Sequence, residues 1–404
     1  MNSYPDAATT HPQRRPRPTT HSWLEIDLAA IRHNVRALKR LLGPHRHLWA
    51  VVKANAYGHG AVPTARAALE AGADGLAVSC LIEAAELRRA GISAPILLLT
   101  ASEPRAAAWT VRLDLMQTAC ASDTMHALSE AAQRFGRLAK VHLKIETGMG
   151  RLGVPPDEAA PFAALIESLP GISLEGVFSH LATAESKDPA YACTQFERFQ
   201  QAVHNIGAAG INPGRRHVAN SAATLRFPEM RLDGVRTGLL LHGILPDAPD
   251  LEPLDLRPAL IWKTSLSFLQ HLPAGSPVSY GSTYVTPRDS LVGVLPLGYA
   301  DGYPRRASNR AQVLIRGRLC PVIGVVCMDH TMIDLTSLPE ARVGDEVVLI
   351  GPQGDSRITA NHLAQWADTV VHEIPTVIGK RVRRVYVDRE QPLDPGRAPE
   401  DDAE

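Results

Sequence analysis

The sequence lacks long apolar runs, paired cysteines and an excess of either charge. No stretch approaches the roughly eighteen consecutive apolar residues of a membrane span. The five cysteines are scattered without a C-x-x-C pair, which argues against a disulfide scaffold or a zinc site and favours a reducing cytoplasm. Lys and Arg total 42, as do Asp and Glu, so no global field attracts nucleic acid or a membrane surface. We therefore expect a cytoplasmic protein with no metal, no nucleic acid and no membrane partner.

The two ends of the chain are polar and rich in proline. The first twenty residues have no hydrophobic centre, which argues against a secretory signal. We expect a disordered N-terminal arm over residues 1–21 and a disordered tail over residues 389–404. Between them, an apolar fraction of 45% in a chain of 404 residues is enough for two domains with cores of their own.

The segment 22–250 has the pattern of a barrel. Eight short apolar runs alternate with amphipathic helical stretches, several of which end in Gly. This alternation predicts a parallel (β/α)8 TIM-like barrel, with a doubly wound open sheet as the competing fold. The helical pattern is weakest in the third connection, "SEPRAAAWTVRL". The runs are "LWAVVKANA", "DGLAVSC", "PILLLTA", "DLMQTAC", "KVHLKIET", "SLEGVFSHLAT", "RRHVANSA" and "VRTGLLLHG".

After residue 250 the pattern changes. Short β-rich runs such as "SLVGVLPLGYA" and "DEVVLIG" follow one another, broken by Gly, Pro and Asp, with no helices between them. This predicts a mainly antiparallel β domain over residues 251–388. The Pro- and Asp-rich segment 246–258 is a plausible linker between the two domains.

One lysine interrupts the first apolar run of the barrel. Lys53 follows Ala-Val-Val in "AVVKANAYGHG" (50–60), and burying an unpaired charge is costly. The plain interpretation is a lysine at a strand end whose stem reaches water. Alternatively, a lysine in an apolar pocket has a lowered pKa and forms a Schiff base with an aldehyde.

Two further residues favour the second interpretation. Ser221 and Gly238 fall after the seventh and eighth predicted strands, where barrels often hold phosphate. A phosphorylated aldehyde held by lysine suggests pyridoxal 5'-phosphate as the cofactor. The rival is a Schiff-base aldolase, for which we expect a single barrel without a large β domain.

The succession of motifs resembles the pyridoxal-phosphate-dependent alanine racemase family. The resemblance runs from about residue 22 to 387 and keeps the family's order and separations. It implies the two-domain architecture predicted above and a homodimer whose active sites are shared, each closed by the partner's β domain. The motifs are "AVVKANAYGHG", "VHLKIETGMGRLG", "GVFSHLATAES", "HVANSAA", "VRTGLLLHG", "VSYGSTY", "GYADGYPR", "GVVCMDHTMIDL", "DEVVLIG" and "HEIPTVIGKRVRRVYV".

The resemblance assigns two catalytic residues. It makes Lys53 the Schiff-base lysine and one acid/base, and Tyr280 the second acid/base, reaching in from the neighbouring subunit. Racemisation needs this pair, because one group removes the α-proton from one face and another returns it to the opposite face. Arg236 would face the pyridine nitrogen, where fold-related amino-acid decarboxylases carry an acid, and His180 would lie against the cofactor ring.

Further site residues follow from the same resemblance. Arg151 would contact the cofactor's phenolic oxygen and the substrate carboxylate, while Asn220 shapes the phosphate loop. Lys144 would be carbamylated and position Arg151; the alternative is an ordinary ion pair with Glu146 or another acid. Phosphate would be bound by Tyr57, Ser221, Gly238 and Leu239, and substrate by Met328 and Tyr299.

Two positions depart from the family pattern. His372 stands where a phosphate-contacting tyrosine is usual, and His242 where "LYG" is usual. We predict that His372 loosens the substrate pocket or makes activity more dependent on pH. The leading function is an alanine racemase that supplies D-alanine for peptidoglycan. The alternatives are a serine or broad-specificity racemase, a non-catalytic pyridoxal-phosphate-binding protein and, opposed by Arg236, an amino-acid decarboxylase.

Overall fold

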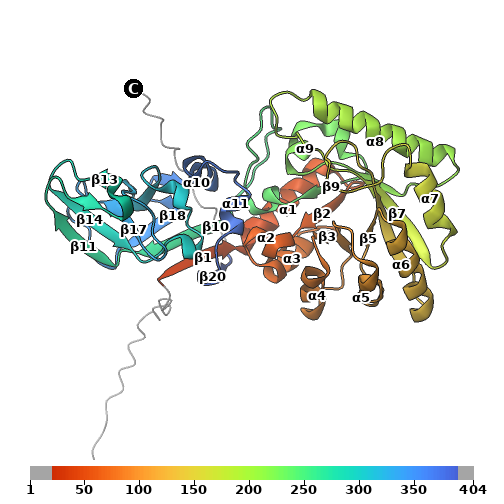
Figure 1. Ribbon diagram of the computed structural model, residues 1–404, viewed down its shortest axis with the longest axis horizontal. Coiled ribbons are helices and arrows are strands. Elements are labelled where there is room, and N and C mark those ends of the chain that lie inside the picture. Colours follow the sequence, from red (N-terminus) through yellow and green to blue (C-terminus); the bar gives the residue numbers. More distant parts are fainter. Residues whose placement is uncertain (1–20, 390–404) are drawn as a thin grey trace, which may run out of the picture.

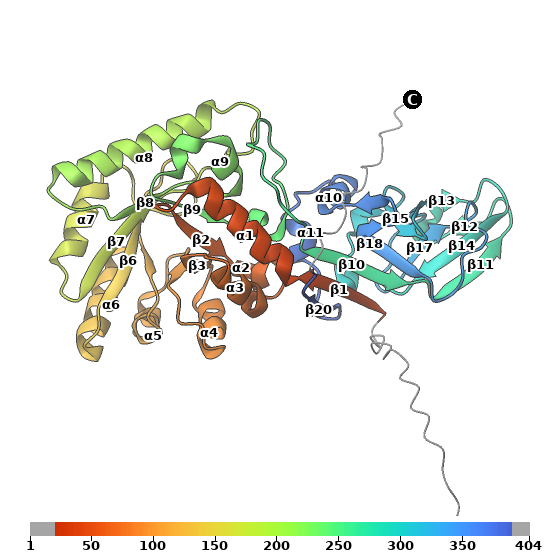
Figure 2. The ribbon, with the colours of Figure 1, turned by 180° about the vertical axis from the view of Figure 1, so that it is seen from behind.

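The structure is a computed structural model that describes residues 21–389. The predicted arm and tail, apart from His21 and Arg389, lie outside the described residues. Figures 1 and 2 show an elongated molecule with an α/β barrel at one end and a β-rich domain at the other. Within the described part of the chain, no helix is long and apolar enough to cross a membrane.

The barrel contains the eight predicted parallel strands. They pair in the orders β4-β3-β2-β9 and β5-β6-β7-β8. A parallel bridge between Leu97 and Met116 joins one side, and the Arg236 amide, which donates to Ala219 O at 3.0 Å, joins the other. The sheet is therefore closed, and the open-sheet alternative is wrong. The strands are β2 (His47–Val51), β3 (Gly75–Val78), β4 (Ile96–Leu98), β5 (Gln117–Ala119), β6 (Ala139–Lys144), β7 (Ile172–Phe178), β8 (Arg215–His217) and β9 (Gly234–Thr237).

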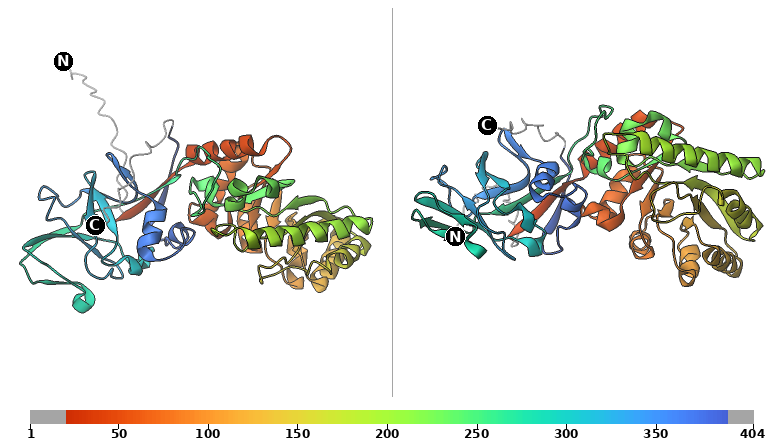
Figure 3. Two further views of the ribbon diagram at one scale, coloured as in Figure 1. Left: turned by 90° about the horizontal axis from the view of Figure 1, so that it is seen from above. Right: turned by 45° about the horizontal axis from the view of Figure 1, so that its top comes forward.

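Helices follow most barrel strands and cover the outside of the barrel (Figure 3). The first begins where the Asp27 carboxylate accepts hydrogen bonds from the Ala29 and Ala30 amides, and ends at Gly43, whose φ is 73°. The weakly patterned third connection is a 3-10 turn, η1 (Pro104–Ala106), and a six-residue helix. The helices are α1 (Leu28–Leu42), α3 (Ala61–Glu70), α4 (Leu81–Arg89), α5 (Ala107–Arg112), α6 (Ser122–Phe135), α7 (Ala159–Ser168), α8 (Ala190–Ala208) and α9 (Ser221–Arg226).

The C-terminal domain is mainly antiparallel, as predicted. Its largest sheet has the order β16-β15-β18-β10-β1-β20, with β19 beside β18, and smaller sheets join β11-β14-β17 and β12-β13. Two short helices, α10 (Ala360–Ala367) and α11 (Glu373–Thr376), also belong to this part of the chain. The strands are β10 (Leu260–Ser265), β11 (Phe268–Leu272), β12 (Pro277–Val278), β13 (Tyr284–Val285), β14 (Ser290–Leu295), β15 (Gln312–Ile315), β16 (Arg318–Pro321), β17 (Thr331–Asp334), β18 (Glu346–Gln353), β19 (Ser356–Ile358) and β20 (Arg383–Val387).

One strand of the β domain comes from a distant part of the sequence, before the barrel. β1 (Ser22–Asp27), which we placed at the start of the barrel segment, pairs antiparallel with β10 and parallel with β20. Its alternate residues Leu24 and Ile26 are fully buried in the core of the β domain, beside Trp262. The predicted boundary at residue 22 therefore needs a correction: the barrel proper begins after this strand.

This strand gives a stability prediction. Trp262 is fully buried, its ring lies edge-on to Tyr303 at 5.8 Å, and its Nε1 donates to Ser22 Oγ of β1 at 2.8 Å. We expect Trp262→Ala to lower the free energy of unfolding by about 3–5 kcal/mol, because a large ring leaves a cavity. The control Ser22→Ala removes one acceptor and costs about 1–2 kcal/mol. Urea titration measures both; a loss below about 1 kcal/mol for Trp262→Ala contradicts the packing.

Candidate active site

A cavity of about 720 Å³ opens at the carboxyl ends of the barrel strands, and α11 of the β domain closes one side of it. Most of the predicted site residues meet here. Sequence reasoning missed several apolar and polar wall residues, including Leu99, Thr100, Phe178 and Glu185. The predicted residues that line the cavity are Lys53, Tyr57, Lys144, Arg151, His180, Asn220, Ser221, Arg236, Gly238 and His372.

Lys53 lies beyond the strand, not within it. β2 ends at Val51, and Lys53 begins α2 (Lys53–Tyr57), in which Ala54, Asn55, Ala56 and Tyr57 have φ between 51° and 55°. Four successive left-handed residues cost about 1–2 kcal/mol each, so the surroundings must hold them.

A half-buried carboxylate supplies part of that support. Glu83 of α4 accepts the amides of Ala54 and Ser79, each at 2.7 Å. This clamp fixes the start of the turn directly after Lys53. The turn therefore leaves the strand abruptly and points the lysine at the cavity.

Two lysines in the cavity are easily deprotonated. Burial lowers the pKa of Lys53, with Arg151 and Arg236 acting in the same direction and Glu83 against it. Burial also lowers the pKa of Lys144 well below its ordinary value, and its Nζ lies 4.9 Å from the centre of the Phe178 ring. Both amines are therefore more nucleophilic at neutral pH than a surface lysine.

Lys144 forms no ion pair with Glu146. That carboxylate instead accepts the amides of Gly148 and Met149 at 2.5 Å and of Arg151 at 3.2 Å. It shapes the loop that carries Arg151 into the cavity. The alternative of an ordinary Lys144–Glu146 pair is wrong for this structure.

Arg236 is buried and rigidly held. Its Nη1 donates to the His217 carbonyl at 2.8 Å and to His217 Nδ1 at 2.9 Å. Its Nη2 donates to Ser179 O at 2.8 Å and lies 3.3 Å from His180 Nδ1. Burial, with Arg151, lowers the pKa of Arg236 to about 9, which leaves it charged at neutral pH.

His142 extends this network beyond His217. His217 Nδ1 accepts from Arg236, so its Nε2–H donates to His142 Nδ1 at 2.9 Å. Burial lowers the pKa of His142 to about 3 and that of His217 well below its ordinary value, so both rings are neutral. Sequence reasoning missed this pair, because a histidine in an apolar strand is typical of a core as well as of a site.

The predicted phosphate residues form a compact group. The Tyr57 phenol lies close against the backbone of Gly238: a Cβ added to Gly238 would lie 2.3 Å from the phenol oxygen. Only a glycine permits this close approach. Ser221 Oγ accepts the Gly238 amide at 3.1 Å, and Asn220 caps α9 through the Ala223 amide at 3.0 Å. Burial raises the pKa of Tyr57 to about 12, so its phenol is a proton donor. Leu239 is buried behind the cavity.

Three predicted site residues lie elsewhere. Tyr280, Tyr299 and Met328 are 72%, 42% and 53% exposed on the β domain and do not line the cavity of their own chain. Backbone hydrogen bonds connect the segments of Tyr299 and Met328. Tyr280 follows Ser279, whose φ of 65° is held by its Oγ bond to Val325 O at 2.6 Å.

The cavity is built for an anion. Lys53, Lys144, Arg151 and Arg236 all line it, and within residues 21–389 none of them has a carboxylate partner within ion-pair distance. A phosphate and a carboxylate would supply the missing negative charge, and a lysine with a lowered pKa suits an aldehyde. The residues present therefore fit pyridoxal phosphate. Fold and site together define a two-domain barrel enzyme for small anionic ligands.

The comparisons identify the family. The profile of the alanine racemase N-terminal domain matches residues 26–246, and that of the C-terminal domain matches residues 259–386. The chain belongs to the alanine racemase family, as the sequence motifs predicted. The alanine racemases of Symbiobacterium thermophilum and Desulfovibrio desulfuricans are 50% and 46% identical over 371 and 366 residues. These alignments cover 92% and 91% of this chain and 97% and 98% of those proteins.

Solved structures agree with the sequence relatives. The alanine racemase of the D-cycloserine-producing Streptomyces lavendulae superposes with a TM-score of 0.86 at 40% identity, over 92% of this chain and 98% of that one. The biosynthetic alanine racemase of Pseudomonas aeruginosa gives a TM-score of 0.82 at 36% identity, over 91% and 100%. The arrangement of barrel and β domain is therefore that of the family.

The neutral histidines give a prediction about stability and pH. Burial lowers the pKa of His59 to about 4 and of His142 to about 3, against about 6.5 in an unfolded chain. Their stabilising contribution is therefore complete above about pH 6.5 and is lost as the pH falls through that range toward the folded values. We expect the free energy of unfolding in urea to drop between about pH 7 and about pH 5. His142→Gln keeps an acceptor for His217 and removes one titrating ring. The slope of its free energy of unfolding against pH should therefore be shallower, by the equivalent of about one bound proton. Parallel wild-type and variant curves would contradict this account.

Proposed function

We propose that this protein interconverts L-alanine and D-alanine with pyridoxal phosphate as its cofactor. The observation that carries the proposal is the position of Lys53, a half-buried amine with a lowered pKa in a cavity with three other unpaired cationic side chains. When bound, the cofactor supplies an electron sink for a carbanion at the amino-acid α-carbon. The other requirements of racemisation fall to the side chains.

Lys53 and Tyr280 divide the proton transfers. Lys53 Nζ would hold the cofactor aldehyde, and as a free amine it would take or return the α-proton on its own face of the substrate. The phenol oxygen of Tyr280 of the partner subunit does the same on the opposite face. Neither direction is favoured by the arrangement itself, because each group serves as base in one direction and acid in the other.

Arg236 and Arg151 orient the reacting molecules. Arg236 is a donor without an acceptor, so it would pair with an unprotonated ring nitrogen of the cofactor and would offer nothing to a protonated one. This pairing would limit how strongly the cofactor stabilises a carbanion, and with it the side reactions. The carbonyl and imidazole partners of Arg236 prevent it from turning away. Arg151 pairs with the substrate carboxylate, and Tyr57, Ser221, Gly238 and the backbone amide of Leu239 surround the phosphate.

The active protein is a homodimer with shared sites. Tyr280, Tyr299 and Met328 are large exposed side chains that do not line the active-site cavity of their own chain. In the dimer they close the partner's cavity, where Met328 meets the substrate carboxylate and Tyr299 the entry path. A second copy of the chain is thus required for a complete site.

Lys144 is carbamylated in the working enzyme. Its lowered pKa increases the fraction of neutral amine, the form that can add carbon dioxide, and the resulting anion would stand beside Arg151 and Arg236. The modification would convert a repulsive neighbour of these arginines into an attractive one. An intact-mass measurement on gently handled protein should show the added carboxyl group, whereas an unmodified mass contradicts the assignment.

Purified protein with pyridoxal phosphate in deuterated water tests the reaction itself. We expect inversion of L-alanine with α-deuterium uptake, faster than for L-serine, and complete loss in Lys53→Ala. Fastest inversion of serine supports the broad-specificity alternative. Cofactor binding without inversion of any amino acid supports the non-catalytic alternative and overturns the proposal.

A mixing experiment tests the shared sites. Lys53→Ala and Tyr280→Phe are each expected to be inactive as pure proteins. After subunit exchange, half of the dimers are mixed, and one of the two sites in each is intact, so about a quarter of the wild-type activity should return. No recovery, with exchange verified by native mass spectrometry, would place both residues in the same subunit's site.

His372 gives a prediction about pH. Burial, with Lys53, lowers the pKa of His372, so the ring is neutral at pH 7 and gains charge only in acid, where it repels Lys53. Its ring lies 6.2 Å from that of Tyr57. We expect His372→Tyr to flatten the loss of activity between about pH 6.5 and about pH 5. The idea fails if both the pH profile and the substrate range of the variant match those of the wild type.

A further inference from the structure

Two histidine rings stack behind the left-handed turn. His59 follows the turn after one glycine, Gly58, and His242 ends η3 (Leu239–His242), the 3-10 turn after β9. Their ring centroids are 3.8 Å apart with planes inclined by 15°, and both side chains are completely buried. Neither residue lines the active-site cavity, so the mechanism above uses neither.

The His59 ring is tied to the turn itself. Its Nδ1–H donates to the Ala56 and Tyr57 carbonyls at 3.1 and 3.0 Å. A ring that donates to two carbonyls of left-handed residues keeps those peptides in place. Any movement of the His59 plane therefore moves the backbone that carries Tyr57.

The His242 ring also packs against the ring of Tyr57, the last residue of the turn. Its centroid lies 5.7 Å from the Tyr57 ring, at an angle of 54°. Thus His242 packs on His59 and on Tyr57 together. Since Tyr57 OH is the atom that stands over Gly238, this contact bears on the phosphate group of residues.

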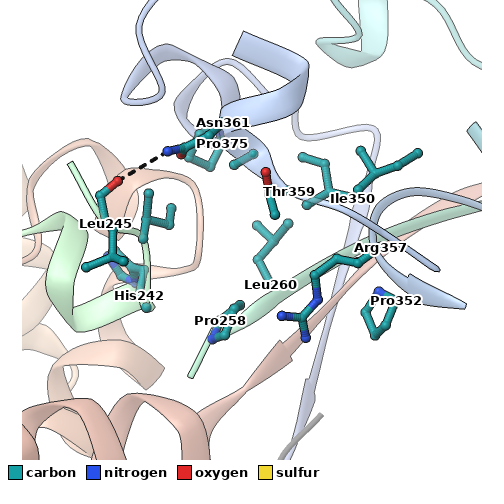
Figure 4. Close-up of a pocket in the computed structure, with 15 residues that line it drawn as sticks. His242, Leu245, Pro258, Leu260, Ile350, Pro352, Arg357, Thr359, Asn361 and Pro375 are labelled. Carbon is teal, nitrogen blue, oxygen red and sulfur yellow. Dashed lines mark hydrogen bonds between the residues drawn. The ribbon is translucent and has the colours of Figure 1, made fainter. Parts of the chain in front are cut away.

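Beyond His242 lies the boundary between the two domains. A pocket of about 210 Å³ separates His242 and Leu245 from Leu260, Thr359 and Pro375 of the β domain (Figure 4). Asn361 Nδ2 donates to Leu245 O across it at 3.4 Å. The β domain therefore does not pack tightly against His242. The side chain that packs against His242 next to the turn is that of His59.

Hydrogen bonding does not explain why His242 is there. Neither of its ring nitrogens has a partner among residues 21–389, and the same holds for His59 Nε2. Buried polar atoms without partners are destabilising. The interaction that His242 does make is the face-to-face contact with His59.

We propose that the His59–His242 stack is a positioning device that holds the left-handed turn, and with it Lys53 and Tyr57, in the geometry that binds cofactor. Both histidines are positioning residues and act through the turn. The four left-handed residues are unstable on their own. Glu83 fixes the beginning of the turn and the stack fixes its end. The part of the proposal that concerns the cofactor rests on the function proposed above.

The test compares three substitutions in full-length protein. His242→Phe keeps a flat ring and removes the unpaired nitrogens, whereas His242→Leu keeps similar bulk without a flat face. Leu241→Ala is the matched control, because Leu241 is a fully buried neighbour in the same 3-10 turn. Each variant is examined by hydrogen exchange at the turn and by its dissociation constant for pyridoxal phosphate.

Three amides report on the turn: Ala56, Gly58 and Gly60, which donate to Val52, Ala54 and Asn55 carbonyls at 2.9, 3.1 and 2.8 Å. In His242→Leu we expect their exchange to accelerate about tenfold and cofactor binding to weaken about fivefold or more. His242→Phe should stay within about twofold of wild type in both. Leu241→Ala should lower global stability and change neither.

The proposal is overturned if His242→Leu leaves these amides at the wild-type rate, or if Leu241→Ala accelerates them equally. It is also overturned if His242→Phe behaves like His242→Leu, because a flat ring would then not be what matters. Failure of the wild type to bind pyridoxal phosphate would refute the proposed function. The exchange rates would still decide whether the stack holds the turn.

Discussion

The site depends on positive charge that the chain does not neutralise. Four cationic side chains line one cavity, and within the described residues no carboxylate lies within ion-pair distance of any of them. Burying like charges together is unfavourable, and it is tolerated where a bound anion completes the arrangement. Burial is the main cause of the lowered pKa values of Lys53 and Lys144, and the two arginines lower them further. The cations that would attract an anionic ligand therefore also contribute to the reactivity of the two amines.

The two domains cooperate around the Lys53 turn. The barrel supplies the cations, while the β domain supplies α11 on one side of the cavity and Arg384 of β20, whose Nε donates to Gly58 O at 3.2 Å. β1 lies between β10 and β20, so the chain enters the β domain before it forms the barrel. The same domain carries Tyr280 on an exposed surface. The β domain thus braces the site of its own chain, and in the homodimer proposed above it would also complete the partner's site.

Much of this was predictable from the sequence, and the remainder has identifiable reasons. The eight barrel strands were predicted because each is a continuous apolar run between helical patterns, as buried parallel strands are. Lys53 stood out because it is a charge directly after such a run. The pairing of β1 was not predictable from local pattern, because its partners β10 and β20 lie more than two hundred residues away in the sequence. The left-handed turn was missed because Ala and Tyr have no preference for positive φ. The Arg236–His217–His142 network was missed because its members come from three separate strands.

The central claim is that Lys53, and not the more deeply buried Lys144, is the amine that reacts with the cofactor. Borohydride reduction of the protein with bound pyridoxal phosphate, followed by peptide mass mapping, tests it most directly. The account predicts a single reduced pyridoxyl group on the peptide that contains Lys53, with Lys144 unlabelled by it. A label on Lys144, or no stable label on either lysine, would contradict the account.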